Sequence, residues 1–356
     1  MFHIDFSACD EYLGSFQHEA VMLTRETWHF RAEAASRWWF VSLGLFSALS
    51  LSSISAAAQT VDDWTARTFT VFKDEHYGNT ERNTFDIILP GSSTTTPLVI
   101  YIHGGGFVQG DKAEAFRSRG EDISYFLRHK VAFASLNYRF YGPVDSMGVK
   151  VCLQDVRTAL QFIRHYAVKY NINKKLIASY GSSAGAGSSL YLAFHDDFAL
   201  KDDTTLLGES TRIGCAGAMA AQATYDVFRW ELFIPGLDTV MEKMKEKFFD
   251  DAAHFYGYAS YRAFAPQRDS ITRSLDMLRM ISPDDPPVFI MNLQKETAPT
   301  DMGIIQHHRA HALILSEYLQ RNGIENEIYV YGNEIKSESD IPRPLREFLL
   351  RHLRQE

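Results

Sequence analysis

Gly181-Ser182-Ser183-Ala184-Gly185 is the stretch that decides the expected fold of this chain. It follows an apolar run at residues 176–180 and precedes a stretch with helical spacing. A serine between small residues at a sharp strand-to-helix turn is typical of a nucleophile elbow, because larger neighbours would clash in such a turn. Backbone N–H groups at the start of the following helix favour negative charge on a bound oxygen. The motif therefore predicts Ser183 as a nucleophile in acyl transfer, although the same five-residue pattern also occurs at ordinary turns.

A second glycine motif lies upstream, where the apolar run 98–102 leads into His103-Gly104-Gly105-Gly106-Phe107. Glycines let backbone N–H groups approach a substrate oxygen without intervening side chains. We expect the N–H groups of Gly105, Gly106 and Ala184 to form an oxyanion hole. His103 belongs to this loop and is expected to order it rather than to act as a base. The neighbours Gly104, Phe107 and Ser182 are expected to contact substrate.

Strand and helix patterns alternate along most of the chain, which predicts an α/β protein. The order is two strands in a hairpin pair, then repeated strand and helix, as expected for a mostly parallel, doubly wound sheet with helices on both faces. The expected strands are residues 69–72, 84–89, 98–102, 131–137, 176–180, 213–221, 288–293 and 328–331. The expected helices are residues 113–130, 149–170, 184–195, 305–322 and 342–353.

The alternation stops between about residues 224 and 282, where aromatic residues are frequent. An insertion at this point would lie over the carboxyl edge of the strands, where such sheets bind ligands. We interpret it as a cap that lines an apolar or aryl pocket. Alternatively, its aromatic side chains pack the cap on itself. They are Tyr225, Phe228, Trp230, Phe233, Phe248, Phe249, Phe255, Tyr256, Tyr258, Tyr261 and Phe264.

Composition narrows the function classes. The chain has 356 residues and a hydrophobic content of 46%, which suffices for a large core. Its net charge is −8 and it has no basic run, which argues against nucleic-acid binding.

Residues 1–58 form an expected N-terminal extension. Its apolar core from Trp38 and the small residues before position 59 predict a signal peptide of a secreted or periplasmic protein. The alternative is an uncleaved membrane anchor, although no stable membrane span is expected. Cys152 and Cys215 are expected to be buried free thiols, and the oligomeric state stays open.

Four segments of the remaining domain, residues 59–356, resemble α/β-hydrolase esterases and lipases of the hormone-sensitive-lipase and bacterial feruloyl-esterase-like (carboxylesterase) group. They are residues 101–107, 137–139, 181–187 and 284–288, and the resemblance spans about residues 69–353. It implies an α/β-hydrolase fold and a serine hydrolase that cleaves carboxylic esters without metal or organic cofactor. It also implies a chain order of serine, then an acid after the next-to-last strand, then a histidine after the last strand.

The sequence departs from that order, because residues 332–340 contain no histidine. His195 would lie about 18 Å along the helix from Ser183. His308 is the preferred base, because it extends the apolar stripe of its helix to the end nearest the catalytic edge. His307 is the second candidate, and a structural or exposed histidine pair is the alternative. His254 would have to reach the serine from the cap, and His352 lies in the last helix.

The acid is displaced as well, and Glu296 or Asp301 is expected to orient the histidine. His307 and His311 have a helical metal-ligand spacing, but no carboxylate is in register, so a metal site is not expected. The sequence thus predicts a serine esterase acting through an acyl-enzyme on Ser183, with a small, apolar or aryl ester as its partner. The alternatives are a catalytically impaired binding protein of this fold, and an amide or peptide hydrolase.

Overall fold

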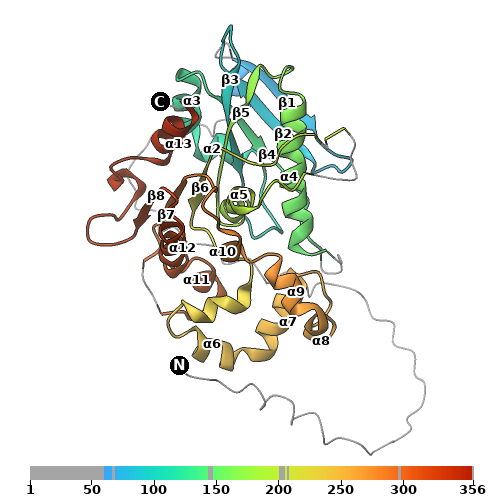
Figure 1. Cartoon of the computed structure of the whole chain (residues 1–356), viewed down its shortest axis with the longest axis vertical. Helices are drawn as coiled ribbons and strands as arrows, with labels where there is room; N and C mark the ends of the chain where they lie inside the picture. Colours follow the sequence, from blue (N-terminus) through green and yellow to red (C-terminus); the bar gives the residue numbers. More distant parts are fainter. Residues whose placement is uncertain are drawn as a thin grey trace, which may run out of the picture. The chain divides into compact units, whose positions relative to one another are not determined.

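An eight-stranded mixed sheet forms the centre of the fold in the computed structural model (Figure 1). The structure describes residues 60–65, 69–142, 147–199, 205–206, 208–295 and 298–354. Its strand order is β1-β2-β4-β3-β5-β6-β7-β8. The strands are β1 (Thr70–His76), β2 (Thr84–Leu89), β3 (Thr96–Ile102), β4 (Ala132–Leu136), β5 (Ile172–Ser182), β6 (Cys215–Met219), β7 (Val288–Asn292) and β8 (Asn326–Val330).

Strand direction follows the predicted pattern. β1 and β2 pair antiparallel as the opening hairpin, and β2 also pairs antiparallel with β4. The remaining neighbours, from β4 through β3 to β8, are parallel. All eight predicted strands are confirmed, and the largest differences in their bounds are four residues, at the end of β1, which extends to His76, and at the start of β5, which begins at Ile172. The predicted mostly parallel, doubly wound sheet is therefore correct.

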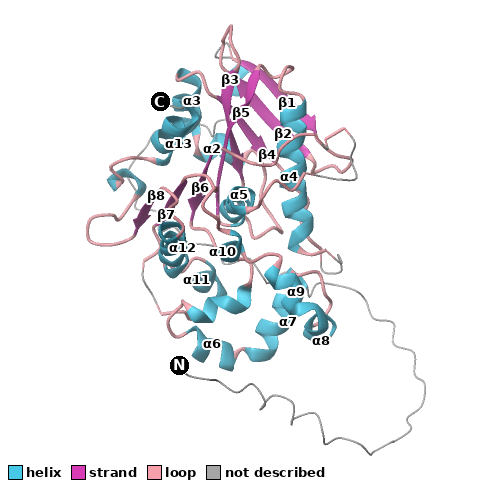
Figure 2. Ribbon diagram, in the orientation of Figure 1, coloured by secondary structure: helices cyan, strands magenta, loops and turns pink. Residues whose placement is uncertain are grey.

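Helices cover both faces of the sheet (Figures 1 and 2). The sheet residues alternate between two apolar clusters, so that Ile100 joins one cluster whereas Val99 and Tyr101 join the other. Helices α4 (Val149–His165), α5 (Ala184–Phe194) and α12 (Ala310–Arg321) contribute to the first cluster. Helices α1 (Asp62–Thr65), α2 (Glu114–Ser118), α3 (Gly120–Arg128) and α13 (Leu345–Arg354) contribute to the second.

Two of the predicted helices are interrupted. The helix expected at residues 113–130 is divided into α2 and α3 at Arg119, whose φ of −122° is not helical. The helix expected at residues 305–322 begins earlier, as α11 (Met302–Gln306), and resumes as α12 only at Ala310. The second break has a consequence for the site, because His307 lies in the turn between the two helices.

The aromatic-rich segment between β6 and β7 consists of helices and loops in Figure 2. Part of its aromatic content packs on itself, since the rings of Phe228 and Tyr256 both stack with Phe264. Its helices are the 3-10 helix η2 (Val227–Leu232), α6 (Leu237–Lys243), α7 (Lys245–Phe255), α8 (Tyr261–Phe264), the 3-10 helix η3 (Ala265–Gln267), α9 (Arg268–Arg273) and α10 (Met277–Met280).

The predicted signal peptide lies outside the described residues and stays a prediction. Among the residues that the structure describes, none of the helices combines the length and the apolar character needed to cross a membrane. Cys152 and Cys215 are both buried free thiols, as predicted, and burial raises the pKa of each well above its usual value.

Candidate active site

Ser183 stands at a sharp turn between β5 and α5, with φ 52° and ψ −118°. This left-handed conformation is costly for a residue with a Cβ, and such strain is typical of functional sites. The flanking glycines make the turn possible. A Cβ on Gly181 would lie 2.4 Å from the carbonyl oxygen of Ile102 in β3, and one on Gly185 would lie 2.0 Å from the same oxygen. The elbow therefore requires glycine at both positions because its backbone packs directly against β3.

His307 faces this serine. Its Nε2 atom lies 2.9 Å from Ser183 Oγ, and its Nδ1 atom lies 3.1 Å from the carbonyl oxygen of Gly303 in α11. A proton on Nδ1 would be donated to that carbonyl, which leaves Nε2 free to accept the serine proton. Burial lowers the pKa of His307 below its usual value of 6.5, so the neutral ring that this arrangement needs is favoured at pH 7.

Of the other predicted base and acids, His308 and Asp301 form hydrogen bonds away from Ser183. His308, the preferred candidate from the sequence, is buried, and its Nδ1 accepts the backbone N–H of Ala310 at 3.2 Å. It sits in the turn before α12 and not in the helical stripe expected for it, because α11 and α12 are separate helices. Asp301 caps the start of α11 by accepting the N–H of Ile304 at 3.1 Å. Glu296 lies outside the described residues. Within the described part of the chain, no carboxylate is hydrogen-bonded to His307.

The glycine loop after β3 adopts backbone conformations that side chains disfavour. Gly105, Gly106 and Phe107 have φ values of 99°, 61° and 66°. Among the described residues, the N–H groups of Gly105, Gly106 and Ala184 have no hydrogen-bond acceptor. Gly104 packs against the elbow, since a Cβ there would lie 2.8 Å from the carbonyl oxygen of Ser182. The loop thus brings unpaired backbone donors beside the strained serine.

His103 fixes this loop. Its ring stacks on Tyr138 at 4.3 Å between centroids, and its Nδ1 donates to the carbonyl of Gly104 at 2.7 Å. The guanidinium of Arg82 donates to the other ring nitrogen at 3.3 Å. Burial lowers the pKa of His103 to about 4, which keeps the ring neutral and able to accept from Arg82. These contacts agree with the expected ordering role.

A cavity opens above Ser183 between the elbow and the aromatic-rich segment. It encloses about 520 Å³ including its mouth. Of the predicted substrate contacts, Phe107 lines it, whereas Gly104 and Ser182 are not among its lining residues. Sequence reasoning missed the polar Gln222 and Gln306 on its wall, for which no motif gives a signal. The wall is otherwise mostly apolar and comprises Gly106, Phe107, Ser183, Ala184, Tyr225, Val227, Trp230, Phe248, Ala252, Phe255 and Met302.

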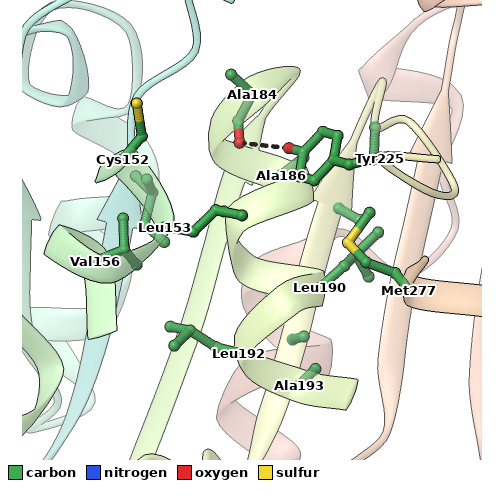
Figure 3. Packing of buried hydrophobic residues seen from close by; sticks show 14 of the residues in the cluster. Cys152, Leu153, Val156, Ala184, Ala186, Leu190, Leu192, Ala193, Tyr225 and Met277 are labelled. Atoms are coloured by element: carbon green, nitrogen blue, oxygen red, sulfur yellow. Dashed lines mark hydrogen bonds between the residues drawn. The ribbon is translucent and has the colours of Figure 1, made fainter. Parts of the chain in front are cut away.

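Tyr225 lines the cavity and is hydrogen-bonded to Ala184 at the start of α5. Figure 3 shows this hydrogen bond. The hydroxyl of Tyr225 donates to the carbonyl of Ala184 at 3.2 Å, and its ring meets Phe107 at 5.5 Å and Phe255 at 5.8 Å between centroids. A Cβ on Gly187 would lie 1.8 Å from the tyrosine hydroxyl oxygen. The cavity wall and the elbow are therefore one packed unit.

Among the described residues, no three histidine, cysteine, aspartate or glutamate side chains are grouped so that they could hold a metal ion. His311, the helical partner of His307, is fully buried and directs its two ring nitrogens to the backbone of Ala223 and Ile305.

The strand order, the elbow and the glycine loop define an esterase/lipase-like α/β-hydrolase. The chain belongs to the BD-FAE family, whose model matches residues 85–298, more than half of the chain. The resemblance found in the sequence is therefore confirmed at the level of the family and the fold.

Solved structures share this fold at low sequence identity. A truncated carbohydrate esterase from gut microbiota is 18% identical, with a TM-score of 0.52 over 73% of this chain and 87% of the other. A bifunctional GH43-CE protein of Bacteroides eggerthii is also 18% identical, with a TM-score of 0.58 over 79% of this chain and 38% of the other. A thermophilic esterase from Thermogutta terrifontis is 14% identical, with a TM-score of 0.50 over 81% and 91%.

A curated relative covers a shorter stretch. The neuroligin-like protein glit-1 of Caenorhabditis elegans is 29% identical over 117 residues, which are 30% of this chain. The match spans 14% of the length of that relative.

Proposed function

We propose that the protein is a serine hydrolase of carboxylic esters, with Ser183 as nucleophile and His307 as general base. The observation that carries the proposal is the 2.9 Å separation between Ser183 Oγ and His307 Nε2, beside backbone N–H groups that have no acceptor in the described part of the chain. Serine hydroxyls need such a neighbouring base at neutral pH. Family membership and the esterases among its structural relatives support the ester as substrate.

In the first half of the reaction, Ser183 Oγ attacks the ester carbonyl carbon while its proton moves to His307 Nε2. The carbonyl electron pair moves onto the oxygen, which the N–H groups of Gly105, Gly106 and Ala184 bind. When the tetrahedral intermediate collapses, the bond to the alcohol oxygen breaks and His307 returns the proton to the leaving alcohol. The product is an acyl group on Ser183.

In the second half, His307 takes a proton from water as the water oxygen attacks the acyl carbon. The bond to Ser183 Oγ then breaks, the serine regains its proton from His307, and the carboxylic acid leaves. Because the carbonyl of Gly303 faces Nδ1, the proton on that nitrogen stays in place throughout.

The wall of the cavity supports an uncharged, apolar or aryl group as the part of the substrate that is buried. Aromatic surface on this wall is supplied by Phe107, Tyr225, Phe248 and Phe255. A polar substituent of the substrate can form hydrogen bonds with Gln222 and Gln306. An ionised substituent would lose its hydration without gaining an opposite charge on this wall.

The experiment is to treat the full chain with a fluorophosphonate probe and with p-nitrophenyl acetate and butyrate. We expect labelling of Ser183, turnover of the esters, and loss of both in Ser183→Ala. His307→Ala should lower kcat by at least about 10²-fold. Turnover without labelling, or labelling without turnover, would contradict the proposal.

Two controls sharpen the test. His308→Ala removes a neighbouring imidazole that does not face the serine, and we expect it to retain most of the activity. A p-nitroanilide with the same acyl group distinguishes amide from ester cleavage, and faster cleavage of the anilide would favour an amidase. If His308→Ala were inactive while His307→Ala stayed active, the assigned base would be wrong.

A further inference from the structure

Three consecutive backbone carbonyls end the short helix that carries His307 into the site. They belong to Ile305, Gln306 and His307 itself. The last carbonyls of a helix lack partners within the helix, and when they are buried they need donors from elsewhere. In this protein each of the three accepts a hydrogen bond from a side chain, and the three side chains come from different parts of the chain.

The three donors are the side chains of Gln222, Asn292 and His311. We refer to these three residues together as the carbonyl clamp. His311 Nε2 donates to Ile305 at 3.1 Å, Gln222 Nε2 to Gln306 at 2.8 Å, and Asn292 Nδ2 to His307 at 3.0 Å. Gln222 follows β6, Asn292 ends β7, and His311 lies in α12. The turn that presents His307 is thus attached to two neighbouring strands and one helix.

The direction of two of these bonds is set by further contacts. His311 Nδ1 accepts the backbone N–H of Ala223 at 3.2 Å, so the proton of the neutral ring must be on Nε2, where it can be donated. The side-chain oxygen of Asn292 accepts the N–H of Gln294 at 3.1 Å, so its amide nitrogen faces His307. The clamp donors are therefore in the correct orientation before any substrate binds.

Burial makes the clamp stiff. His311 is fully buried, with edge contacts to Trp230 at 5.0 Å and Phe233 at 5.3 Å between ring centroids. Asn292 and Gln222 are also buried. Among the described residues, the carbonyls of Gln306 and His307 accept no other hydrogen bond, whereas that of Ile305 also accepts the backbone N–H of His308 at 3.3 Å. A buried carbonyl that loses its only donor costs about 1 to 3 kcal/mol, so the turn has a strong preference for this arrangement at Gln306 and His307.

We propose that Gln222, Asn292 and His311 are positioning residues, which orient the His307 ring toward Ser183 through its backbone. In Ser-His-Asp triads a carboxylate on Nδ1 holds the ring. Here the Nδ1 partner is the carbonyl of Gly303 in α11, the helix that ends just before His307, so fixing the end of that helix fixes both the ring and its acceptor. The inference rests on the proposed function, because these residues are assigned to the support of the proposed pair Ser183 and His307.

Two substitutions at His311 separate this role from a general contribution to folding. In His311→Gln, the amide nitrogen can occupy the position of Nε2 and still donate to Ile305, while the acceptor for Ala223 is lost. In His311→Asn, the side-chain oxygen can occupy the position of Nδ1 and still accept from Ala223, while the donor to Ile305 is lost. Each variant keeps one of the two bonds, so a structural role alone predicts similar losses.

We expect kcat for p-nitrophenyl acetate to fall by about 10- to 100-fold in His311→Asn with KM within about two-fold, since a displacement near 1 Å costs this much in rate. His311→Gln should stay within about three-fold of the wild type. Asn292→Asp, which replaces the donor by an acceptor of the same shape, should behave like His311→Asn. His308→Ala, which removes a side-chain bond on the same turn but outside the clamp, is the control and should be close to wild type.

Thermal unfolding of each variant is measured first, so that the assay temperature can be set below every transition. Equal kcat losses in His311→Gln and His311→Asn, or an unchanged kcat in Asn292→Asp, would overturn the clamp while leaving the serine esterase proposal intact. A wild-type protein without turnover would instead remove the function on which the clamp depends.

Discussion

The hydroxyl of Tyr225 donates a hydrogen bond to the backbone carbonyl of Ala184, 3.2 Å away (Figure 3). Ala184 is the first residue of α5 and supplies one of the proposed oxyanion donors. Its carbonyl also accepts the hydroxyl of Ser188 at 2.9 Å. Tyr225 thus lines the cavity and also anchors the start of α5 through its hydroxyl.

Replacing the tyrosine by Tyr225→Phe should lower the free energy of unfolding by about 1 kcal/mol, because one buried hydrogen bond is lost while Ser188 still satisfies the carbonyl. Chemical denaturation measures this value. Tyr258→Phe is the matched control, since it removes a hydroxyl bonded to Gln267 at an exposed position, and its effect should be within about 0.5 kcal/mol. Equal effects in both variants would show that the Ala184 bond adds nothing.

The close approach of α5 to the same ring gives a second prediction. Gly187→Ala places a Cβ 1.8 Å from the Tyr225 hydroxyl oxygen, so the ring or the helix must move. We expect a destabilisation of about 1 to 3 kcal/mol, with a loss of activity, because the displaced helix carries the elbow. Gly91→Ala is the control, since apart from its chain neighbours no described residue has an atom within 4 Å of the added Cβ. Thermal unfolding and ester turnover of both variants test the contrast, and a stable, active Gly187→Ala would contradict it.

The pH dependence of kcat/KM follows from the environment of His307. The base must be neutral, and burial lowers its pKa below 6.5, so activity should be lost only as pH falls below 6.5 and should be constant from there to about pH 8. Initial rates between pH 4 and 9 at low substrate concentration measure the midpoint. A midpoint above 6.5 would indicate a carboxylate partner on Nδ1, which stabilises the charged ring.

Two buried neutral histidines should make the fold sensitive to acid. Burial lowers the pKa of His103 to about 4 and that of His311 to about 3, whereas both have values near 6.5 in the unfolded chain. Between pH 6.5 and 4 the unfolded state binds more protons, so the free energy of unfolding decreases as pH falls, by up to about 1.4 kcal/mol per pH unit for each ring.

His311→Phe tests this contribution, because phenylalanine cannot be protonated but can occupy the space beside Trp230 and Phe233. Urea unfolding at pH 5, 6 and 7 should show a smaller pH slope in this variant than in the wild type. An identical slope would mean that His311 is protonated in the folded protein.

The sheet could be predicted in detail because its signal is local. The central strands are short apolar runs, such as Val288–Asn292, and the glycines at residues 181 and 185 are required by the close approach of the elbow backbone to β3. The prediction that favoured His308 over His307 was based on one continuous helix across residues 305–322. The structure has two helices there, and His307 is the residue that faces Ser183. At this break the backbone carbonyls accept hydrogen bonds from Gln222, Asn292 and His311, which come from separate elements of the fold, and the sequence carries no pattern that would reveal them.

The same limit applies to the acceptor for Nδ1. A carboxylate is recognisable by its residue type, as in the candidates Glu296 and Asp301. A backbone carbonyl such as that of Gly303 exists at every position, so its selection is visible only when the helix is built.

Because His307 precedes the last strand, the proposed base is not supplied by the segment that follows β8. The proposed serine, base and oxyanion donors all lie between residues 105 and 307, so among the described residues β8, the loop after it and α13 hold none of them. The loop is fastened at its own end by the capping box of Ser337 and Asp340 and by the ion pair of Glu338 with Arg119. We therefore expect this loop to tolerate chain cleavage, the fusion of a carbohydrate-binding module or the attachment of a surface tether, with the proposed site unchanged.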